Sequence, residues 1–432
     1  MYNMPRENHL LFNELELNQH LLHALKEAGY TKATPIQEEA IPHLMNNKDL
    51  LGCAQTGTGK TAAFALPILQ NIMEEKTIGK GAIKALILAP TRELAIQIGD
   101  SFQTYAKYLP LNIQVIFGGV SQNPQTATLK RGTDILVATP GRLLDLIKQG
   151  FVKLNQVDFF VLDEADMMLD MGMLRDVRHI IRELPKKRQS MFFSATMPNE
   201  IEKLAGTILS NPVKVVVNPV SSTVEVIQQS VYRVAKTDKT NLLIYLLKNK
   251  QVERSLVFSR TKHGANKIVK KLLQAGFSAE AIHGNKSQNA RQQALENFKT
   301  MKTSVLVATD IAARGIDVPE LSQVIQFDLP EVPETYIHRI GRTGRAGLGG
   351  KAISFCDETE SDLLRDIEKL SKRKVPVIKD HPYLLKEGTQ APTQQARKAV
   401  ATRNNGTRAK SKQVRRGGQK SAQRPRVQTK NT

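Results

Sequence analysis

Short runs of apolar residues recur along most of the chain, and a longer amphipathic stretch follows each of them. In the first half these runs predict strands at residues 49–53, 85–89, 113–117, 135–138, 159–162 and 191–193. In the second half they predict strands at residues 255–258, 279–282, 304–308, 323–327 and 352–355. Strands that alternate with helices indicate a mostly parallel sheet covered on both faces, and therefore an α/β fold. Ligands of such sheets bind beyond the carboxyl ends of the strands.

Breaks in this pattern divide the chain into segments. Leucines at near-helical spacing predict helices in residues 1–45, where Gly29 ends one helix and Thr34-Pro35 starts the next. Turn-forming residues, among them Asn211-Pro212 and Asn218-Pro219, predict a linker. The expected segments are an N-terminal helical segment (1–45), an α/β domain (46–210), a linker (211–227), a second α/β domain (228–380) and a tail (381–432).

The net charge of +21 over 432 residues changes this picture, because it favours polyanions such as nucleic acids or anionic membranes. Twelve lysines and arginines and no acidic residue lie between Arg397 and Thr432, where apolar residues are sparse. Such a segment buries too little surface to offset the entropy lost on ordering, so we expect it to be disordered. It is either a flexible tether for a polyanion such as nucleic acid or a solubilising extension.

The cysteine content and the lack of long apolar runs indicate the cellular compartment of the protein. The two cysteines, Cys53 and Cys356, are too few for a zinc knuckle or a disulfide framework. Residues 1–14 lack the apolar core of a signal peptide, and no run approaches the roughly 18 apolar residues of a membrane span. We therefore expect a soluble cytoplasmic protein without membrane partners, and nucleic acid is the favoured polyanion.

A glycine-rich turn lies between the first predicted strand and a predicted helix. It reads Ala54-Gln55-Thr56-Gly57-Thr58-Gly59-Lys60-Thr61. The backbone N–H groups of such a turn, together with the positive end of the helix dipole, bind phosphate. Lys60 would contact the β- and γ-phosphates, and the Thr61 hydroxyl would ligate Mg²⁺. Ala54 stands where the usual pattern has a glycine, which indicates a variant of this phosphate loop.

Four residues, Asp163-Glu164-Ala165-Asp166, directly follow the apolar run at 159–162. This places carboxylates at the carboxyl end of a buried strand, on the same sheet edge as the phosphate loop. Asp163 could hold Mg²⁺, and Glu164 could orient and deprotonate the attacking water, which is the arrangement that phosphoryl transfer requires. We take Lys60, Asp163 and Glu164 as candidate catalytic residues.

With these motifs in order, the sequence closely resembles a DEAD-box ATP-dependent RNA helicase over nearly all of residues 12–380. The basic tail resembles the bacterial RhlE-like branch most. The resemblance implies two tandem RecA-like domains flanking a cleft. The further motifs that carry it are Gly29–Gln37, Pro90–Ala95, Gly118-Gly119, Thr139–Arg142, Ser194–Thr196, Val257–Thr261, His283-Gly284, Gln288 with Arg291, Ala308–Asp317 and His338–Arg345.

The resemblance assigns residues to ATP. Gln37 would read the adenine edge, and Phe12 would stack on the base; packing between helices is the alternative role for Phe12. Arg342 and Arg345 would reach the γ-phosphate from the second domain, and Asp317 would meet the ribose. The expected nucleotide contacts are Phe12, Gln37, Thr56, Gly57, Thr58, Gly59, Lys60, Thr61, Asp317, Arg342 and Arg345, and the expected Mg²⁺ ligands are Thr61 and Asp163.

The resemblance also assigns a path for RNA and a coupling element. The path residues would bind phosphate and sugar, so they would not read sequence, and the single arginines could alternatively be structural. The expected path is Thr91, Arg92, Gly119, Thr139, Arg142, Arg260, Gly284, Thr309 and Arg314. Ser194 and Thr196 would link Asp166 and His338, unless they only cap the end of a strand.

The sequence thus predicts an ATP hydrolase that locally unwinds or remodels RNA duplexes and RNA–protein complexes, with ATP and Mg²⁺ as cofactors. RNA, single-stranded or duplex, is the expected partner, and ribosome-assembly or RNA-degradation proteins suit the family. An ATP-gated RNA clamp or scaffold without productive unwinding fits the same motifs. A DNA translocase fits less well, because its motifs around the acidic tetrad and His338 normally differ.

Overall fold

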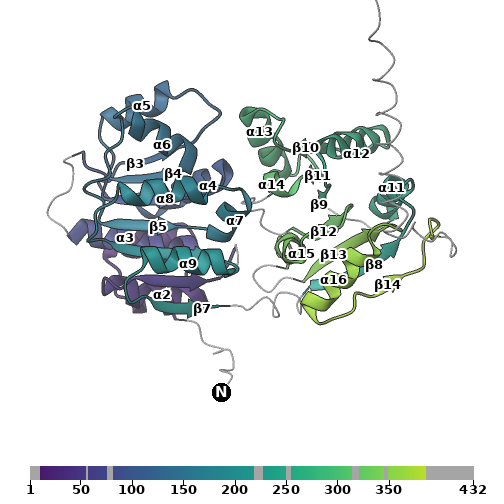
Figure 1. Cartoon of the computed structure of the whole chain (residues 1–432), viewed down its shortest axis with the longest axis horizontal. Helices are drawn as coiled ribbons and strands as arrows, with labels where there is room; N and C mark the ends of the chain where they lie inside the picture. The colour runs from purple at the N-terminus through teal and green to yellow at the C-terminus, as the bar shows by residue number, and fades with distance from the viewer. Residues whose placement is uncertain are drawn as a thin grey trace, which may run out of the picture. The chain divides into compact units, whose positions relative to one another are not determined.

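The computed structural model describes residues 10–54, 57–74, 81–217, 227–249, 254–313, 321–344 and 349–385. These residues form two seven-stranded sheets in which every strand pairing is parallel (Figure 1). This confirms the α/β class. No helix in these ranges is both long and apolar enough to span a lipid bilayer.

The first sheet has the strand order β3-β4-β2-β5-β6-β1-β7. Its strands are β1 (Leu50–Cys53), β2 (Ala85–Leu88), β3 (Ile113–Ile116), β4 (Ile135–Ala138), β5 (Phe159–Leu162), β6 (Gln189–Ser194) and β7 (Val213–Val216). Its helices are η1 (Phe12–Glu14), α1 (Gln19–Glu27), α2 (Pro35–Met45), α3 (Lys60–Glu74), α4 (Arg92–Tyr105), α5 (Asn123–Lys130), α6 (Pro140–Lys148), α7 (Ala165–Asp170), α8 (Leu174–Arg182) and α9 (Asn199–Ile208).

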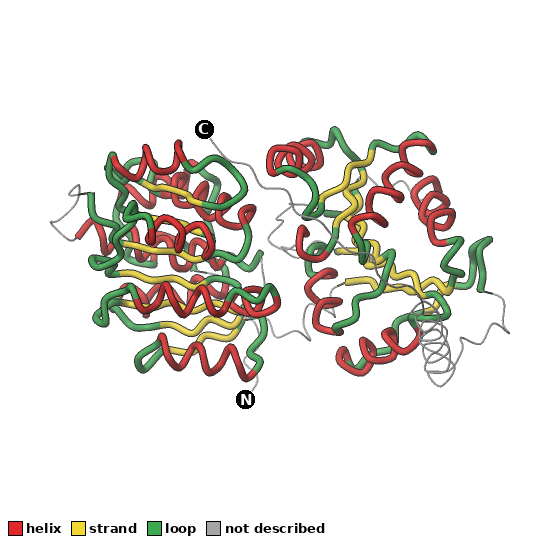
Figure 2. Tube along the Cα trace, turned by 45° about the horizontal axis from the view of Figure 1, so that its top comes forward, coloured by secondary structure: helices red, strands yellow, loops and turns green. Residues whose placement is uncertain are grey.

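Successive side chains along these strands point to opposite faces of the sheet and pack in two separate hydrophobic cores. Ile87 and Val161 pack with helices α1 to α4 on one face, whereas Leu86, Leu88 and Phe160 pack with α6 to α9 on the other. Strands β2, β4, β5 and β6 are buried along their whole length. Figure 2 shows the strands running between two layers of helix.

The N-terminal helices belong to the first of these cores. Leu21, Leu25 and Ile36 are buried in the same cluster as residues of α3. Helix α1 ends where the sequence predicts, because Gly29 adopts a φ of 81° and Tyr30 N–H donates to the Leu25 carbonyl. Residues 10–45 therefore pack in the same hydrophobic core as the first sheet.

The second sheet has the strand order β10-β11-β9-β12-β13-β8-β14. Its strands are β8 (Ile227–Arg233), β9 (Ser255–Phe258), β10 (Ala279–Ile282), β11 (Val305–Ala308), β12 (Gln323–Gln326), β13 (Gly350–Cys356) and β14 (Val377–Ile378). Its helices are α11 (Lys239–Asn249), α12 (Lys262–Gln274), α13 (Gln288–Lys299), α14 (Asp310–Ala313), α15 (Pro333–Ile340) and α16 (Ser361–Ser371). Helices α11 and α12 cover one face, and α13 to α16 cover the other.

Three strands are absent from the sequence prediction, and each has a weak apolar pattern. β7 pairs with β1 inside the stretch 211–227 that we expected to be a linker, because turn residues on both sides mask its valines. β8 is rich in polar residues, and β14 has two residues. β6 also extends beyond the predicted 191–193, because Gln189, Ser190 and Ser194 are polar but buried in the sheet.

Candidate functional site

The predicted functional residues follow the carboxyl ends of strands in both sheets, and they divide by function along the strand order. In the first sheet, the predicted RNA residues follow the neighbouring strands β3, β4 and β2, whereas the phosphate loop, the acidic tetrad and the Ser-Ala-Thr motif follow β1, β5 and β6. In the second sheet, predicted RNA residues follow β10, β11 and β9, which are also neighbours. One half of the first sheet's edge therefore holds the predicted nucleotide residues, and the other half holds the predicted RNA residues.

The phosphate loop has the backbone that its glycines predict. Gly57 and Gly59 adopt φ values of 85° and 96°, and α3 begins at Lys60. Lys60 is only 5% exposed, yet its Nζ makes no hydrogen bond within the described ranges and lies 3.7 Å from Asp163 Oδ1. A buried ammonium group with three donors and no acceptor is costly unless a ligand supplies one, and phosphate oxygens fit this need.

Gln37 contacts the phosphate loop directly. Its Nε2 donates to the carbonyl oxygen of Gly59 at 3.0 Å, and its Oε1 accepts from Thr34 N–H at 2.9 Å. A Cβ atom on Gly59 would lie 2.5 Å from Gln37 Nε2, so only glycine fits here. The contact joins the predicted adenine reader to the loop that would hold the phosphates.

Phe12 lies in the apolar core and is 3% exposed. Its ring meets Tyr30 edge-on, with the centroids 6.2 Å apart. This is the helix-packing role that the sequence left open, and the stacking role on adenine stays a prediction.

Asp163 and Glu164 are buried at the end of β5, with 2% and 4% exposure. Burial raises the pKa of Asp163 to about 6, although Lys60 lowers it. Glu164 adopts left-handed backbone angles, φ 50° and ψ 53°, and its N–H donates to Asp163 Oδ1 at 2.9 Å. A non-glycine residue in this region costs about 1–3 kcal/mol, and such strain is typical of functional sites.

The predicted coupling residues of the first sheet form one hydrogen-bonded group. Asp166 Oδ2 accepts from both the N–H and the hydroxyl of Thr196, each at 2.9 Å. Ser194 Oγ accepts from Asp166 N–H at 3.2 Å and donates to the Thr196 carbonyl at 2.7 Å. The end of β6 and the start of α7 are therefore linked by three side chains. His338 lies on α15, which packs on the second sheet.

The predicted RNA residues of the first sheet include two helix N-caps and a glycine–arginine contact. Thr91 precedes α4 and accepts from Leu94 N–H, and Thr139 precedes α6. Gly119 adopts a φ of 79°, and a Cβ atom there would lie 2.2 Å from two guanidinium nitrogens of Arg92. Arg142 Nη2 donates to the Val120 carbonyl at 3.0 Å. Both arginines therefore lie against the loop of residues 117–121.

In the second sheet, Arg260, Gly284 and Thr309 come directly after or near the ends of β9, β10 and β11. The side chain of Arg260 is 41% exposed. A Cβ atom on Gly284 would meet nothing within 4 Å, so the backbone there is open to a ligand. These positions suit contacts with phosphate and sugar.

Helix α15 leads from the second sheet to the predicted arginine fingers, and Arg342 follows it with 7% exposure. Arg339, which sequence analysis left without a role, makes bonds of 2.6 and 2.9 Å from Nε and Nη2 to the two carboxylate oxygens of Asp310. It also donates to the Asp328 carbonyl at 2.7 Å. Arg339 belongs to the quoted His338–Arg345 motif, so the motif was the available signal, but its partner could not be identified from spacing.

Several predicted residues lie outside the described ranges. They are Thr56, Arg314, Asp317 and Arg345, together with the basic tail beyond residue 385. The described ranges contain no group of three or more His, Cys, Asp or Glu side chains that could hold a metal ion. The donor set of Thr61 and Asp163 instead suits Mg²⁺, which binds few protein ligands and completes its shell with phosphate oxygens and water.

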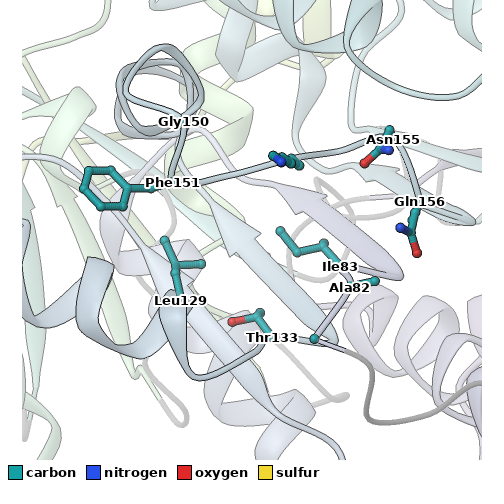
Figure 3. A pocket seen from close by; sticks show the side chains of 10 residues that line it. Ala82, Ile83, Leu129, Thr133, Gly150, Phe151, Asn155 and Gln156 are labelled. Atoms are coloured by element: carbon teal, nitrogen blue, oxygen red, sulfur yellow. The ribbon is translucent and has the colours of Figure 1, made fainter.

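A cavity of about 500 Å³ lies apart from these residues (Figure 3). Its lining includes Ala82 and Ile83 before β2, Thr133 before β4, and Asn155 and Gln156 before β5. These residues precede their strands, so the cavity lies at the amino ends of the strands, opposite the phosphate loop. It does not belong to the candidate site.

The chain matches two families. The DEAD/DEAH box helicase family matches residues 34–204, and the helicase conserved C-terminal domain matches residues 238–347. The ATP-dependent RNA helicase CshA of Limosilactobacillus reuteri is 42% identical over 368 residues, covering 85% of this chain and 73% of that protein. The DEAD-box ATP-dependent RNA helicase CshA of Streptococcus pneumoniae is 42% identical over 389 residues, covering 90% and 73%.

Solved structures of related helicases have a similar fold. Dbp5 of S. cerevisiae, bound to RNA and ADP BeF3, superposes with a TM-score of 0.76 at 33% identity, over 85% of this chain and 95% of that one. A DEAD box protein from Methanococcus jannaschii gives 0.51 at 40% identity, over 85% and 99%. The bacterial relatives named here are CshA proteins, so they do not support the expected RhlE-like branch. The chain belongs to the DEAD-box family of ATP-dependent RNA helicases.

Proposed function

We propose that this helicase hydrolyses ATP at the phosphate loop of the first domain and uses the cycle to separate or remodel short RNA duplexes and RNA–protein complexes. The supporting observation is the strand order of the first sheet, in which the strands followed by the predicted nucleotide residues are neighbours and so are the strands followed by the predicted RNA residues. β5 and β2 pair directly at the boundary between the halves, so a change at the acidic tetrad is one strand away from Thr91 and Arg92. Because coupling passes through packed neighbouring elements, this pairing favours coupling between ATP and RNA binding.

At the nucleotide half, Lys60 donates to phosphate oxygens of ATP. These oxygens are the acceptors that its buried ammonium group lacks within the protein. Thr61 and Asp163 would hold Mg²⁺, which would neutralise charge on the phosphates. Glu164, fixed by its strained backbone, orients the attacking water and takes its proton. Gln37 accepts and donates at the adenine edge while it braces Gly59.

At the RNA half, helix N-termini at Thr91 and Thr139 and the side chains of Arg92 and Arg142 bind backbone phosphates. Arg260, Gly284, Thr309 and Arg314 do the same on the second domain. These contacts carry no sequence information, so the core binds RNA without base preference.

Arg342 and Arg345 act on the γ-phosphate when the two domains close on ATP and RNA, and Asp317 contacts the ribose. Arginines of this kind contribute about 10³–10⁵ in rate. Ser194, Thr196 and Asp166 transmit the nucleotide state toward His338. Because both ligands favour the closed state, each tightens the binding of the other.

The setting of this activity is the cytoplasm, with ribosome-assembly or RNA-degradation proteins as partners. The basic tail adds affinity for RNA. These assignments rest on composition and on the family.

The test combines ATPase and strand displacement on a short RNA duplex. We expect weak ATPase alone, strong stimulation by RNA, and displacement that requires ATP. Stimulated ATPase without displacement would favour an ATP-gated clamp instead. ATPase that does not respond to RNA would overturn the proposal.

A further inference from the structure

A group of five charged side chains, three of them buried, lies at the carboxyl ends of β9, β12 and β13. Its cations are Lys239 and Arg260, and its anions are Asp328, Asp357 and Glu360. Lys239 and Glu360 are 1% and 2% exposed. Buried charge of this density is stable only where every member is paired, so the group calls for a functional explanation.

Lys239 is the centre of the group. Its Nζ lies 2.6 Å from Glu360 Oε2, 3.1 Å from Asp357 Oδ2 and 3.6 Å from Asp328 Oδ1. Burial lowers the pKa of Lys239, but the three carboxylates outweigh it and the pKa is raised. The lysine therefore stays charged and holds the carboxylates in place.

Glu360 transmits this order to Arg260. Its Oε2 accepts from Lys239, while its Oε1 accepts from Arg260 Nη2 at 2.8 Å and from Leu329 N–H at 3.2 Å. The same Nη2 donates to the Leu329 carbonyl at 3.1 Å. Asp328 holds the backbone of the arginine, since its Oδ2 accepts from Arg260 N–H at 2.9 Å.

These contacts leave other donors of the guanidinium group available. The hydrogen bonds that Arg260 makes from its side chain within the described ranges all use Nη2, and the side chain is 41% exposed. Nε and Nη1 can therefore donate to a phosphate. A guanidinium group that is already held at one nitrogen loses little further freedom when another of its nitrogens donates to a ligand.

We infer that Glu360 and Lys239 are positioning residues for RNA binding: Glu360 orients Arg260 toward a backbone phosphate, and Lys239 keeps Glu360 in place. This inference rests on the proposed role of Arg260 in the RNA path. Neither residue touches RNA. The role differs from a purely structural one because it acts through one named arginine.

The direction in which Glu360→Gln changes RNA affinity distinguishes this inference from a general effect of charge. Glu360→Gln removes a negative charge near the RNA path, and charge alone would make RNA bind more tightly. Loss of orientation would make RNA bind more weakly. Asp362→Asn is the matched control, because it removes a negative charge two residues away on α16, where the side chain is 77% exposed and pairs only with Arg365 among the described ion pairs.

The experiment titrates full-length protein with fluorescently labelled oligouridine RNA, at saturating non-hydrolysable ATP analogue, and measures the RNA dependence of ATPase in parallel. Glu360→Gln should raise the half-saturating RNA concentration about three- to tenfold, as for a lost charge-assisted contact. Turnover at saturating RNA should stay within about twofold of wild type. Arg260→Ala should give a similar loss, and the double variant should add little to it, because both act on one contact. Asp362→Asn should leave affinity unchanged or slightly tighter.

Each other outcome is informative. If Arg260→Ala leaves RNA affinity unchanged, the proposed RNA role of Arg260 fails and the inference fails with it. If Arg260→Ala weakens binding but Glu360→Gln does not, or if the two losses add, the inference is overturned while the proposed function stands. If thermal unfolding shows that Glu360→Gln is not folded, Arg260→Lys decides instead. Lysine keeps the charge but cannot donate to Glu360 and to a phosphate from separate fixed nitrogens, so wild-type affinity in Arg260→Lys would refute the inference.

Discussion

Gln37 Nε2 and the carbonyl oxygen of Gly59 are hydrogen-bonded at 3.0 Å, which ties the base of the phosphate loop to helix α2. Gln37 Oε1 is used as well, because it accepts from Thr34 N–H at 2.9 Å. One amide thus supports the phosphate loop and stands where adenine is expected. A change of this side chain should affect both phosphate binding and the choice of base.

Gln37→Glu should lower kcat/KM for ATP, because a carboxylate would replace the donor that faces the Gly59 carbonyl. Wild type should prefer ATP to GTP, since the second N–H and the second lone pair of the Gln37 amide match the adenine edge but not the guanine edge, and a mismatched buried polar group costs about 1–3 kcal/mol, or roughly 5- to 150-fold in affinity. The variant should lose most of this preference. RNA-stimulated hydrolysis of both nucleotides measures it. A variant that loses ATP and GTP activity in equal proportion would show that Gln37 only supports the loop.

Glu164→Gln keeps the shape of the side chain and removes the proposed base. We expect turnover to fall by about 10²–10⁴, as for other lost general bases, while ATP and RNA still bind. Single-turnover hydrolysis and RNA binding with ATP present measure the two parts. Turnover near that of wild type would contradict the assignment of Glu164.

The sequence predicted the parts of the site that depend on local backbone chemistry. Glycines at 57 and 59 predicted a turn with positive φ, and an apolar run before Asp163 predicted a carboxylate at a strand end; the structure has both. It did not reveal the pairing of Lys239 with Glu360, because these residues are 121 positions apart and no periodic pattern relates them. Such pairs depend on which strands become neighbours, and the order β9-β12-β13 follows from packing of the whole sheet.

The strands show the same limit. Continuous apolar runs identified β2, β4 and β5, which are buried on both faces. β7 lies at the edge of its sheet, where the burial of Val213–Val216 alternates, so its pattern was too short to outweigh the turn residues around it. Edge strands and buried strands with polar residues could therefore be located only in the structure.

Ser194→Ala removes two hydrogen bonds that join β6, Asp166 and Thr196. We expect RNA-stimulated ATPase to stay within a few-fold of wild type while strand displacement per ATP falls about tenfold, if this group couples hydrolysis to remodelling. Ser190→Ala is the matched control on the same strand. Ser190 Oγ is buried and has no hydrogen-bond partner within the described ranges, so its removal should be neutral. Equal loss of ATPase and displacement in Ser194→Ala would indicate a strand-end cap instead.

Gly119→Ala should weaken RNA binding. The added Cβ would lie 2.2 Å from the guanidinium group of Arg92, and the φ of 79° is unfavourable for alanine. Arg92 must then move, so we expect the half-saturating RNA concentration to rise about three- to tenfold. Gly206→Ala is the control, because a Cβ atom at Gly206 meets nothing within 4 Å and helix α9 has no proposed RNA contact. RNA affinity that is unchanged in Gly119→Ala would argue against an RNA contact by Arg92 in this position.

The basic tail should act as a tether for RNA. It lies outside the described residues, and its twelve cations without an acidic residue are the basis for this prediction. A tether raises the effective concentration of RNA near the core and releases counterions, and neither effect changes the chemical step. Deletion of residues 390–432 should therefore raise the RNA concentration for half-maximal ATPase and make the slope of log affinity against log salt shallower.

Turnover at saturating RNA should hardly change on this deletion, because the proposed catalytic residues all precede residue 346. RNA titrations of the full-length and truncated proteins at several salt concentrations measure both quantities. A variant in which the tail lysines and arginines become glutamine is the control, since it keeps the length and removes the charge; it should behave like the deletion. If affinity and slope stay the same in both variants, the tail is a solubilising extension, and a collapse of saturated turnover would mean that it supports the catalytic core.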